Sequence, residues 1–398
     1  MVESKFLPLD GATSVSQAMR QINPDVVAAY PITPQTAVVQ NFSQYVADGI
    51  VNTEFIPVES EHAAMSACVG ASAAGGRVMT ATAANGLALM WEMLYIAAGM
   101  RLPIVLTVVN RALSSPLNIH CDHSDAMGAR DSGWIQIYAE TGQEAYDNTI
   151  QAIRIAEHPD LLLPVMSCQD GFITGHGVER VGILPDSDIK DFVGEYKPRY
   201  ALLNIDEPVT FGAWDFTDYY FEHKRQQSEV INNSLPIIES VFKEYEKLSG
   251  RPQPVLDMWG MDDAEYAIIV LSSTAGTSRA VARRWREKGV KVGVVKPRLY
   301  RPFPEQYLLE AIKNCKAVAV LDRAISFGAP LSQGPLFTDT TAALYNAGIS
   351  GLPVVNYIFG LGGRDILPDH IGSVFSDLQK IASDGQRGTM VRYLGLRE

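Results

Sequence analysis

The sequence of 398 residues predicts an α/β fold with two doubly wound domains. In the first half, short and nearly continuous apolar runs alternate with helix-like runs, which is typical of a parallel sheet covered on both faces. A short Gly- and Pro-containing segment interrupts this pattern, and a second, more regular alternation follows it. We therefore predict one domain over residues 1–250 and another over residues 251–398.

Five segments of the first half carry the clearest pattern. We expect strands at Asp25–Tyr30, Arg77–Ala83 and Pro103–Ala112, and helices at Glu61–Ala74 and Leu87–Met100. The first helix is rich in Ala, Ser, Gly and Cys, so another backbone can approach it closely, and the Gly pair after it is a helix stop signal. Four apolar residues of the second helix are expected to face the core: Leu87, Met90, Leu94 and Ala97.

The segment that joins the two domains is less regular. Leu161–Cys168 is a further strand candidate, and Gln169–Tyr200, rich in Gly, Pro and Asp, is interpreted as loops. Leu235–Ser249 is predicted to be an amphipathic helix and Gly250–Pro254 the linker. We predict about four strands in the second domain, at Tyr266–Ser272, Val290–Lys296, Ala317–Leu321 and Val354–Ile358, with helices at Thr277–Lys288, Glu305–Lys313 and Asp339–Asn346.

Composition limits the classes of partner. Lys and Arg total 33 against 45 Asp and Glu, a formal charge of −12, which argues against nucleic acid or an anionic membrane because both need a basic face. The N-terminus lacks the pattern of a secretory signal, and no apolar run approaches the roughly 18–20 residues of a membrane span. We therefore expect a cytoplasmic protein. Four dispersed cysteines, without a C-x-x-C motif, are expected to be free thiols: Cys68, Cys121, Cys168 and Cys315.

Two short motifs could be mistaken for binding sites. The sequence Gly360-Leu361-Gly362-Gly363 resembles a dinucleotide loop, but it comes late in its domain, so we interpret it as a turn. The sequence His120-Cys121-Asp122-His123 contains metal-capable residues, but adjacent positions in a short loop rarely aim at one ion, so we interpret it as a hydrogen-bonded loop. No P-loop and no H-E-x-x-H motif occurs.

Three polar residues stand at the ends of predicted strands or at a helix start. Thr33 lies between two prolines directly after one strand, and Arg111 closes another. Ligands of open parallel sheets bind beyond these carboxyl ends, where an arginine can pair with a small carboxylate. Glu61 opens the small-residue helix, where a carboxylate could meet a buried ring nitrogen. An N-cap threonine, a structural salt bridge and a helix-dipole glutamate are the alternatives, and residue type alone does not decide.

Long, ordered motifs from about Gly11 to Asp365 carry a family resemblance. The first half holds INPDVVAAYPITPQT, VESEHAAMSACVGASAAGG, VVNRALSSPLNIHCDHSDAMGARDSGWIQIY and PVMSCQDGFI. The second half holds DDAEYAIIVLSSTAGTSR, RLYRPFPEQ, AVAVLDRAISFG and NYIFGLGGRD. On these motifs the chain resembles the α-subunit of pyruvate:ferredoxin oxidoreductase (pyruvate synthase), within the 2-oxoacid:ferredoxin oxidoreductase family.

The resemblance implies a fold and a set of cofactors and partners. The first domain would be the pyrimidine-binding domain of a thiamine-diphosphate enzyme, and the second a transketolase C-terminal-like domain. In this family Mg²⁺, the diphosphate and a proximal [4Fe-4S] cluster belong to a β-subunit, further clusters to a small ferredoxin-like δ-subunit, and a γ-subunit is associated with coenzyme A. The chain lacks the G-D-G motif for metal and diphosphate, since Asp170-Gly171 and Asn232-Asn233 resemble its parts but lie too far apart.

Residue roles follow from the resemblance at matching positions. Glu61 is similar to the glutamate that hydrogen-bonds the aminopyrimidine ring of thiamine diphosphate and so favours deprotonation of the thiazolium carbon. Thr33 and Arg111 are similar to the residues that bind the carbonyl or carboxylate of the 2-oxoacid. The implied reaction is coenzyme A-dependent oxidative decarboxylation of pyruvate to acetyl-CoA and CO₂, with electrons passed to ferredoxin, or its reverse. Asn118 and His120 are close in sequence to Arg111 but receive no role.

The sequence leaves alternatives open for the substrate of the enzyme and for the role of this chain. Related enzymes act on 2-oxoglutarate, 2-oxoisovalerate, indolepyruvate or oxalate, and those that act on oxalate have an Arg where Thr33 stands. A non-catalytic scaffold subunit is a second alternative, because the chain lacks metal and cluster ligands, although Glu61, Thr33 and Arg111 argue against it. A stand-alone dinucleotide-dependent dehydrogenase would rest only on the α/β pattern and the GLGG sequence. The sequence does not indicate the physiological direction, the stoichiometry of the complex or the electron carrier.

Overall fold

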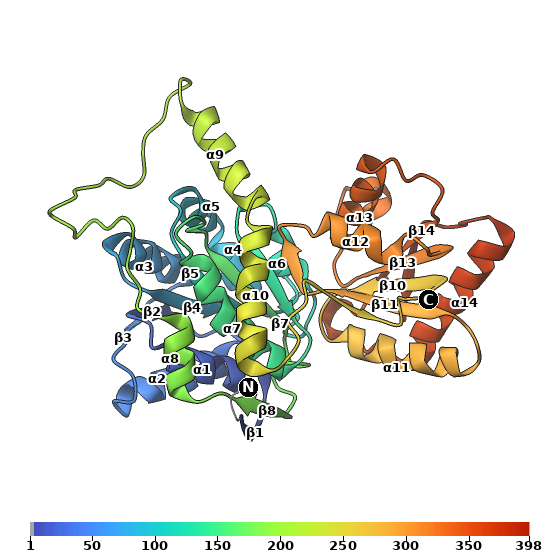
Figure 1. The fold of residues 1–398 in the computed structure, drawn as a ribbon, viewed down its shortest axis with the longest axis horizontal. Coiled ribbons are helices and arrows are strands. Elements are labelled where there is room, and N and C mark those ends of the chain that lie inside the picture. Colours follow the sequence, from blue (N-terminus) through green and yellow to red (C-terminus); the bar gives the residue numbers. More distant parts are fainter. Residues whose placement is uncertain (1–3, 398) are drawn as a thin grey trace.

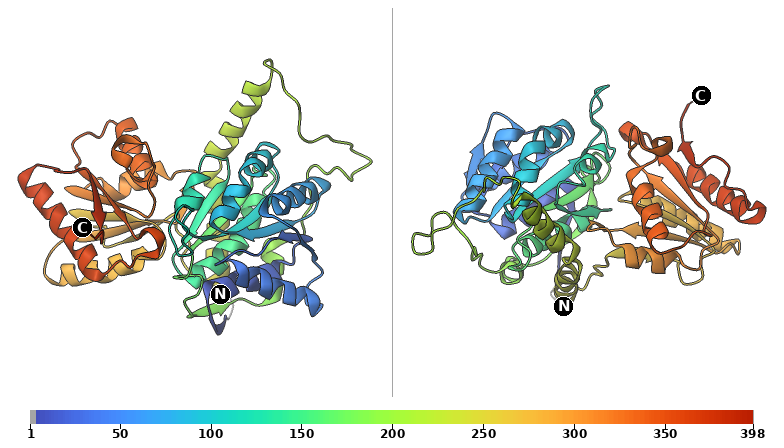
Figure 2. Two further views of the ribbon diagram at one scale, coloured as in Figure 1. Left: turned by 180° about the vertical axis from the view of Figure 1, so that it is seen from behind. Right: turned by 90° about the horizontal axis from the view of Figure 1, so that it is seen from above.

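Two open, twisted sheets organise the chain into two lobes, which the computed structural model describes over residues 4–397 (Figures 1 and 2). The first lobe contains a 7-stranded sheet in the order β12-β6-β7-β5-β4-β2-β3. The second contains a 6-stranded sheet in the order β15-β14-β13-β10-β11-β9. The predicted α/β class is confirmed, and in both sheets most neighbouring strands run parallel.

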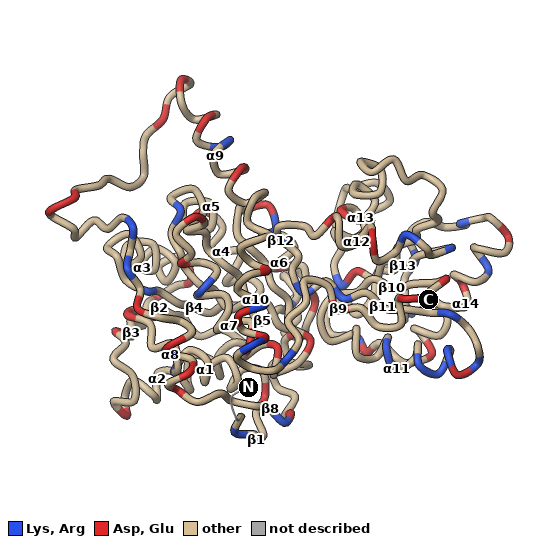
Figure 3. The backbone as a smooth tube through the Cα atoms, viewed as in Figure 1, with Lys and Arg blue, Asp and Glu red and all other residues tan. Residues whose placement is uncertain are grey.

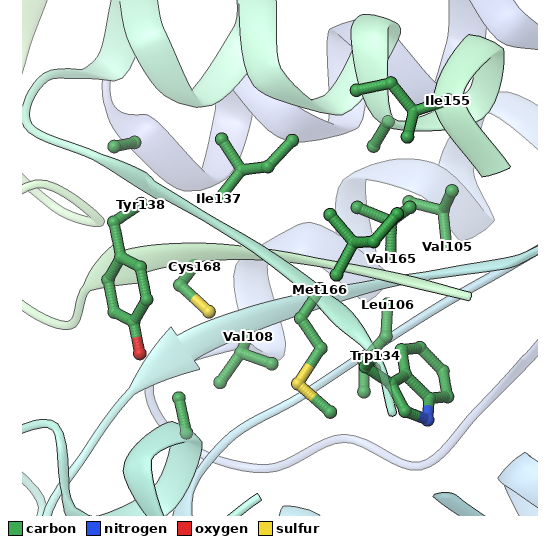
Figure 4. Packing of buried hydrophobic residues seen from close by; sticks show 14 of the residues in the cluster. Val105, Leu106, Val108, Trp134, Ile137, Tyr138, Ile155, Val165, Met166 and Cys168 are labelled. Atoms are coloured by element: carbon green, nitrogen blue, oxygen red, sulfur yellow. The ribbon is translucent and has the colours of Figure 1, made fainter. Parts of the chain in front are cut away.

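The first sheet follows the predicted strands closely. Its members are β2 (Val26–Ala29), β3 (Glu54–Pro57), β4 (Val78–Thr82), β5 (Ile104–Asn110), β6 (Ile135–Ala139), β7 (Val165–Asp170) and β12 (Leu299–Arg301). The central strands are buried along their whole length, which explains their nearly unbroken apolar sequences. Figure 4 shows this core, where side chains of β5, β6 and β7 pack beside Trp134 and below the helix that carries Ile155.

Helices cover both faces of the first sheet. They are α1 (Gly11–Ile22), α2 (Thr36–Ala47), α3 (Glu61–Ala74), α4 (Ala84–Leu89), α5 (Trp91–Gly99), α6 (Ser124–Gly128) and α7 (Gly142–Ala156). Helix α3 has the predicted bounds, because Ser60 caps its first turn through a hydrogen bond from the Ala63 N–H and Gly75 ends it in the left-handed conformation. The predicted helix Leu87–Met100 is two helices that meet at Met90, yet its four apolar residues are buried as expected.

The interpretation of Gln169–Tyr200 as loops was wrong. This stretch contains the end of β7, the strand β8 (Glu179–Ile183) and the helix α8 (Asp186–Val193). Strand β8 pairs antiparallel with β1 (Lys5–Leu9), a partner from the far N-terminus that local sequence does not announce. Helix α8 follows Pro185, has two acidic residues in its first turn and buries only Ile189 and Val193, so its apolar signal is short.

An extended arm leaves the first lobe after α8. It runs over residues 194–219 and returns along α9 (Tyr220–Asn232) to α10 (Leu235–Ser249), which packs against α7 (Figure 1). The predicted linker Gly250–Pro254 is anchored rather than free, since Arg251 forms an ion pair with the buried Asp147 at 2.6 Å.

The second lobe holds more strands than predicted. Around the expected β10 (Tyr266–Val270), β11 (Val292–Pro297), β13 (Ala317–Asp322) and β14 (Val354–Phe359) lie two short edge strands, β9 (Leu256–Trp259) and β15 (Val391–Leu394). Its helices are α11 (Thr274–Glu287), α12 (Glu305–Ile312), α13 (Pro335–Asn346) and α14 (Pro368–Asp384), with short 3₁₀ turns at Pro330–Ser332 and Leu361–Gly363. Both edge strands have only 4 residues and partial burial, so their apolar pattern is weak.

The domain boundary near residue 250 stays a prediction. Strand β12 comes after that boundary, yet it pairs antiparallel with β6 of the first sheet. The chain therefore returns to the first lobe between β11 and α12 before it completes the second sheet.

Charged side chains of both signs are spread over the two lobes, and the basic residues of α11 are all arginines (Figure 3). Among the described residues, no helix combines the length and the apolar character that crossing a bilayer requires.

Candidate active site

The candidate site lies at the carboxyl edge of the first sheet. Strands β2, β4 and β5 are neighbours in this sheet, with β3 beside β2, and all four run parallel. Their C-terminal ends therefore meet at one edge, which is where open α/β sheets bind ligands. Thr33 follows β2, Glu61 follows β3 and Arg111 follows β5.

Arg111 and Thr33 are in direct contact. The Arg111 guanidinium donates from Nη1 to the main-chain carbonyl of Thr33 at 2.7 Å and from Nε to the carbonyl of Asn118 at 3.0 Å. The residue is buried, at 7% exposure, whereas Thr33 is exposed. Among the described residues, Nη2 makes no hydrogen bond and no carboxylate pairs with Arg111. Two neutral carbonyls fix the orientation of this cation and leave its charge for a ligand.

Glu61 lies in the first turn of α3, packed against the turn that follows β4. A Cβ added to Gly86 of α4 would come 2.7 Å from Glu61 Oε1 and 2.5 Å from Thr82 Oγ1, so the glycine makes room for the carboxylate. Glu61 is 6% exposed and forms no hydrogen bond with the described residues, and the buried Thr82 hydroxyl also lacks a partner. The Glu61 side chain forms no hydrogen bond with Arg111 or Thr33; in the sheet order, β4 and β2 lie between β3, which Glu61 follows, and β5, which Arg111 follows.

A further carboxylate connects these segments. Asp125 on α6 accepts the N–H of Ala84 at 2.9 Å, the N–H of Arg111 at 3.0 Å and the side-chain amide of Asn110 at 2.8 Å. Burial raises the pKa of Asp125 to about 6, although these N–H donors act to lower it. The sequence did not point to this residue, because the local sequence around an Asp in a His- and Asp-rich loop does not show which N–H groups will donate hydrogen bonds to it.

The segment His120–His123 forms a hydrogen-bonded loop between the lobes, as predicted. His123 Nε2 lies 2.7 Å from Asp170 Oδ1 at the end of β7, and Arg323 Nη1 of the second lobe lies 3.0 Å from Asp170 Oδ2. Burial alone would raise the pKa of the Asp170 carboxyl, but His123 and Arg323 hold it well below its usual range. Asp170 is therefore committed to an ion pair with Arg323.

Two groups of side chains in the described part of the chain have metal-ligand geometry. One comprises Cys121, His123 and Asp170, and the other Glu140, Glu144 and Asp257. Cations of the chain itself already contact both groups, Arg323 in the first and Lys296 in the second. We assign both groups to ion pairing between the lobes. The four cysteines are free thiols, as predicted.

Comparisons with known proteins agree with this architecture. Residues 17–243 match the family described as pyruvate flavodoxin/ferredoxin oxidoreductase, thiamine diphosphate-binding, and residues 264–371 match pyruvate:ferredoxin oxidoreductase core domain II. The chain is 56% identical to pyruvate synthase subunit PorA of Thermotoga maritima over 98% of this chain and 97% of that protein. It is 42% identical to the subunit of the same name from Methanocaldococcus jannaschii, over 98% of each chain. It is 38% identical to ketoisovalerate oxidoreductase subunit VorA of Pyrococcus abyssi over 100% of both chains.

Two solved structures share the fold. One is a 2-oxoglutarate:ferredoxin oxidoreductase from Magnetococcus marinus, with a TM-score of 0.73 at 20% identity, covering 94% of this chain and 65% of that longer chain. The other is a split-gene transketolase, with a TM-score of 0.55 at 12% identity, covering 95% of this chain and 99% of that one. The predicted pyrimidine-binding-type domain followed by a transketolase C-terminal-like domain is consistent with both neighbours. From the two family matches and the full-length relatives, the chain belongs to the pyruvate:ferredoxin oxidoreductase family.

Proposed function

We propose that this chain is the α-subunit of a multisubunit pyruvate:ferredoxin oxidoreductase. The complex would convert pyruvate and coenzyme A into acetyl-CoA and CO₂ and pass the electrons to ferredoxin, or run the reverse synthesis. The observation that carries this proposal is the 56% identity to a pyruvate synthase subunit over nearly the whole length of both chains. The geometry at the sheet edge supports it, because a buried guanidinium and a buried carboxylate lie there, neither with an ion-pair partner among the described residues.

Thiamine diphosphate fits the surroundings of Glu61. Within residues 4–397, the buried Glu61 carboxylate and the neighbouring Thr82 hydroxyl both lack a hydrogen-bond partner, and Gly86 keeps the space around both open. When bound, the cofactor supplies the carbon nucleophile and the electron sink for decarboxylation of a 2-oxoacid. Glu61 would accept a hydrogen bond from a ring nitrogen of the aminopyrimidine and so hold a proton at that atom. Its place in the first turn of α3 suits a carboxylate, because the helix dipole favours negative charge at this end.

Arg111 and Thr33 would bind the substrate. Arg111 presents a guanidinium that has lost most of its contact with water and has no carboxylate partner in the described chain, so a small carboxylate gains a strong charge-assisted hydrogen bond there. Thr33 sits beside it on an exposed turn between two prolines and offers a hydroxyl to the substrate's carboxylate or carbonyl. Together they would hold the 2-oxoacid in one orientation and neutralise its charge.

Partner subunits would complete the enzyme. We place Mg²⁺, diphosphate binding and a [4Fe-4S] cluster in a β-subunit, further clusters in a small ferredoxin-like δ-subunit, and a coenzyme A-associated γ-subunit beside them, in a cytoplasmic complex. The arm supports the existence of such partners, since large apolar side chains stand exposed along it, including Leu203, Ile205, Trp214, Phe216 and Phe221. An exposed apolar surface of this kind marks a protein interface.

Another 2-oxoacid, such as 2-oxoisovalerate, is the second candidate substrate. The 38% identity to ketoisovalerate oxidoreductase subunits shows that the same scaffold occurs with another named substrate, but that identity is lower than the 42–56% to the pyruvate synthase subunits cited above. A branched substrate needs a wider pocket than pyruvate, so selectivity among 2-oxoacids is the deciding property.

The test is a substrate panel on the native complex. The chain is purified with its co-purifying partners under anaerobic conditions, and viologen reduction is followed with pyruvate, 2-oxoisovalerate, 2-oxoglutarate, indolepyruvate and oxalate, each with coenzyme A. The proposal predicts the highest kcat/KM with pyruvate and no activity of the isolated chain. A higher kcat/KM with another 2-oxoacid would overturn the substrate, and inactivity of a cluster-loaded complex with every 2-oxoacid would overturn the function.

A further inference from the structure

The turn between β14 and α14 contacts the loop that orients Arg111. This turn, residues 360–363, has the sequence GLGG and belongs to the second lobe. The loop, residues 118–122, belongs to the first lobe and follows Arg111 in the chain. The proposed function gives no catalytic or substrate-binding role to any residue of the turn or the loop. Even so, hydrogen bonds donated by each segment join the two.

Three hydrogen bonds cross between the lobes at this point. Asn118 Nδ2 donates to the Gly362 carbonyl at 3.0 Å, the Gly362 N–H donates to Asp122 Oδ2 at 3.2 Å, and the Gly363 N–H donates to the Cys121 carbonyl at 2.7 Å. Asp122 is itself buried and also accepts the N–H of Ser124. Main-chain donors and acceptors of the turn are thus paired with main-chain and side-chain groups of the loop, which fixes their relative position.

The contact continues to the guanidinium. Arg111 Nε donates to the Asn118 carbonyl at 3.0 Å, and the Asn118 side chain also accepts the His120 N–H at 2.7 Å. Asn118 therefore joins Gly362 on one side to Arg111 on the other. A shift of this loop would remove one of the two carbonyls that aim the guanidinium.

The glycines of the turn are required by space as well as by conformation. Gly362 and Gly363 have φ of +59° and +78°, and a Cβ on either would lie closer than 3.0 Å to the loop, against Asn118 at Gly362 and against His120 at Gly363. The close approach of the two segments therefore depends on the missing side chains.

We propose that the GLGG turn of the second lobe is a positioning element for the substrate site. It holds the loop of residues 118–122 so that the Asn118 carbonyl orients the Arg111 guanidinium toward the carboxylate of the 2-oxoacid. The second lobe thus contributes to substrate binding without touching the substrate. This inference rests on the proposed role of Arg111, and its test includes a readout that is independent of that role.

The test compares two alanine substitutions in the assembled complex. Gly363→Ala places a methyl group against His120, whereas Gly348→Ala has the same kind of left-handed backbone, with φ of +72°, and nothing within 4 Å of its added Cβ. Both variants carry similar backbone strain, so their difference isolates the contact with the loop. We expect Gly363→Ala to raise the KM for pyruvate by about fivefold or more with little change in kcat, and Gly348→Ala to match the wild type.

Two further variants separate positioning from damage. His120→Gly removes the side chain that the new methyl group meets. The KM of the double variant Gly363→Ala/His120→Gly should therefore lie close to the KM of His120→Gly alone. Asn118→Ala should raise the KM without any added bulk, because it removes the hydrogen bonds to Gly362 and His120, and it serves if Gly363→Ala fails to assemble.

Hydrogen exchange provides the readout that does not depend on activity. Backbone amides of residues 111–123 should exchange faster in the Gly363→Ala complex than in the Gly348→Ala complex. Equal exchange rates and equal KM in Gly363→Ala and Gly348→Ala would overturn the inference. Faster exchange in Gly363→Ala without a change in its KM would also overturn it, provided that Arg111→Lys still raises the KM. If Arg111→Lys leaves KM unchanged, the role of Arg111 fails and the inference fails with it.

Discussion

Arg111 shows what a residue type indicates and what only the fold adds. An arginine at the end of an apolar strand was a candidate for a carboxylate ligand from sequence, but a structural salt bridge was equally compatible. In the structure its partners are carbonyls, and one of them belongs to Thr33, 78 positions away in the chain. Such a partner is set by strand order, which no local pattern reveals. The roles of Arg111, Thr33 and Glu61 stay predictions that the following experiments test.

Arg111→Lys should weaken pyruvate binding while the complex still assembles. A lysine keeps the charge but cannot donate to the Thr33 and Asn118 carbonyls and to a substrate in the fixed geometry of a guanidinium. Loss of a hydrogen bond to a charged group costs roughly 1.5–3 kcal/mol, so the KM should rise by about 10- to 100-fold. The control is Arg180→Lys, an exposed position on β8, and an equal KM in both variants would contradict the role of Arg111.

Asp125 makes substrate binding depend on pH. Its carboxylate holds the N–H groups of Arg111 and Ala84, and protonation near its pKa of about 6 weakens these hydrogen bonds. The KM for pyruvate should therefore rise as the pH falls below about 6, and Asp125→Asn should show a higher KM without this dependence.

The stability of the protein should change in the opposite direction. The pKa of Asp125 is higher in the folded chain than the value of about 3.9 in an unfolded one, so between these values only the folded chain holds the proton. The contribution of this group to stability therefore increases as the pH falls from about 6 to 4. The KM of wild type and Asp125→Asn is measured from about pH 5.5 to 7.5, and their apparent Tm from about pH 4 to 7.5, the range that contains the expected change in stability. An identical pH dependence of KM in both proteins would exclude Asp125 as its source.

At the level of elements, the sequence predicted those that carry their own signals. Helix α3 was correct to the residue, because a serine cap, small side chains and a Gly pair define it locally. The pair β1–β8 was missed because its two strands lie far apart in the chain. The sequence could also not show that the turn into α4 would pack on Glu61, since this contact depends on β3 and β4 flanking β2.

Gly86→Ala should impair catalysis through Glu61. The added methyl group meets Glu61 Oε1 at 2.7 Å and Thr82 Oγ1 at 2.5 Å, so the carboxylate must move from its position at the start of α3. Misplacement of a catalytic group by about 1 Å can cost about 100-fold in rate, and we expect a loss of kcat of this order at near-normal assembly. Gly70→Ala in α3 is the control, because nothing lies within 4 Å of its Cβ. Equal kcat in the two variants would contradict the proposed packing role.

At the scale of the whole molecule, ion pairs join the lobes. Lys296 of β11 is buried at 1% side-chain exposure and contacts Glu140 at 2.9 Å, Glu144 at 2.5 Å and Asp257 at 3.4 Å. Burial alone would lower the pKa of Lys296, but the Glu144 and Glu140 carboxylates raise it. The order of the two α/β patterns was readable from sequence, whereas this network was not, because its members come from four separate elements or their ends.

Lys296→Met should destabilise the protein strongly. Among the described residues, it leaves Arg279 as the remaining ion-pair partner of Glu140 and Asp257, and breaking a buried ion pair costs roughly 3–5 kcal/mol. The apparent Tm of the purified complex should fall well below that of the wild type. Lys316→Met removes an exposed pair with Glu265 and should leave the Tm unchanged. A Tm for Lys296→Met equal to that of Lys316→Met would show that the network does not hold the lobes together.

The central claim is that this chain contributes a catalytic carboxylate to an active site that its partners complete. The most direct measurement is pyruvate-dependent viologen reduction by assembled complexes carrying Glu61→Gln or Glu59→Gln, after their subunit, cluster and thiamine diphosphate contents have been matched. Glu59 is an exposed carboxylate two positions away and serves as the control. The account predicts that Glu61→Gln lowers kcat by about 100-fold or more, while Glu59→Gln turns over like the wild type. Equal turnover by both variants would contradict the catalytic role of Glu61 and would favour a subunit that serves only as a scaffold.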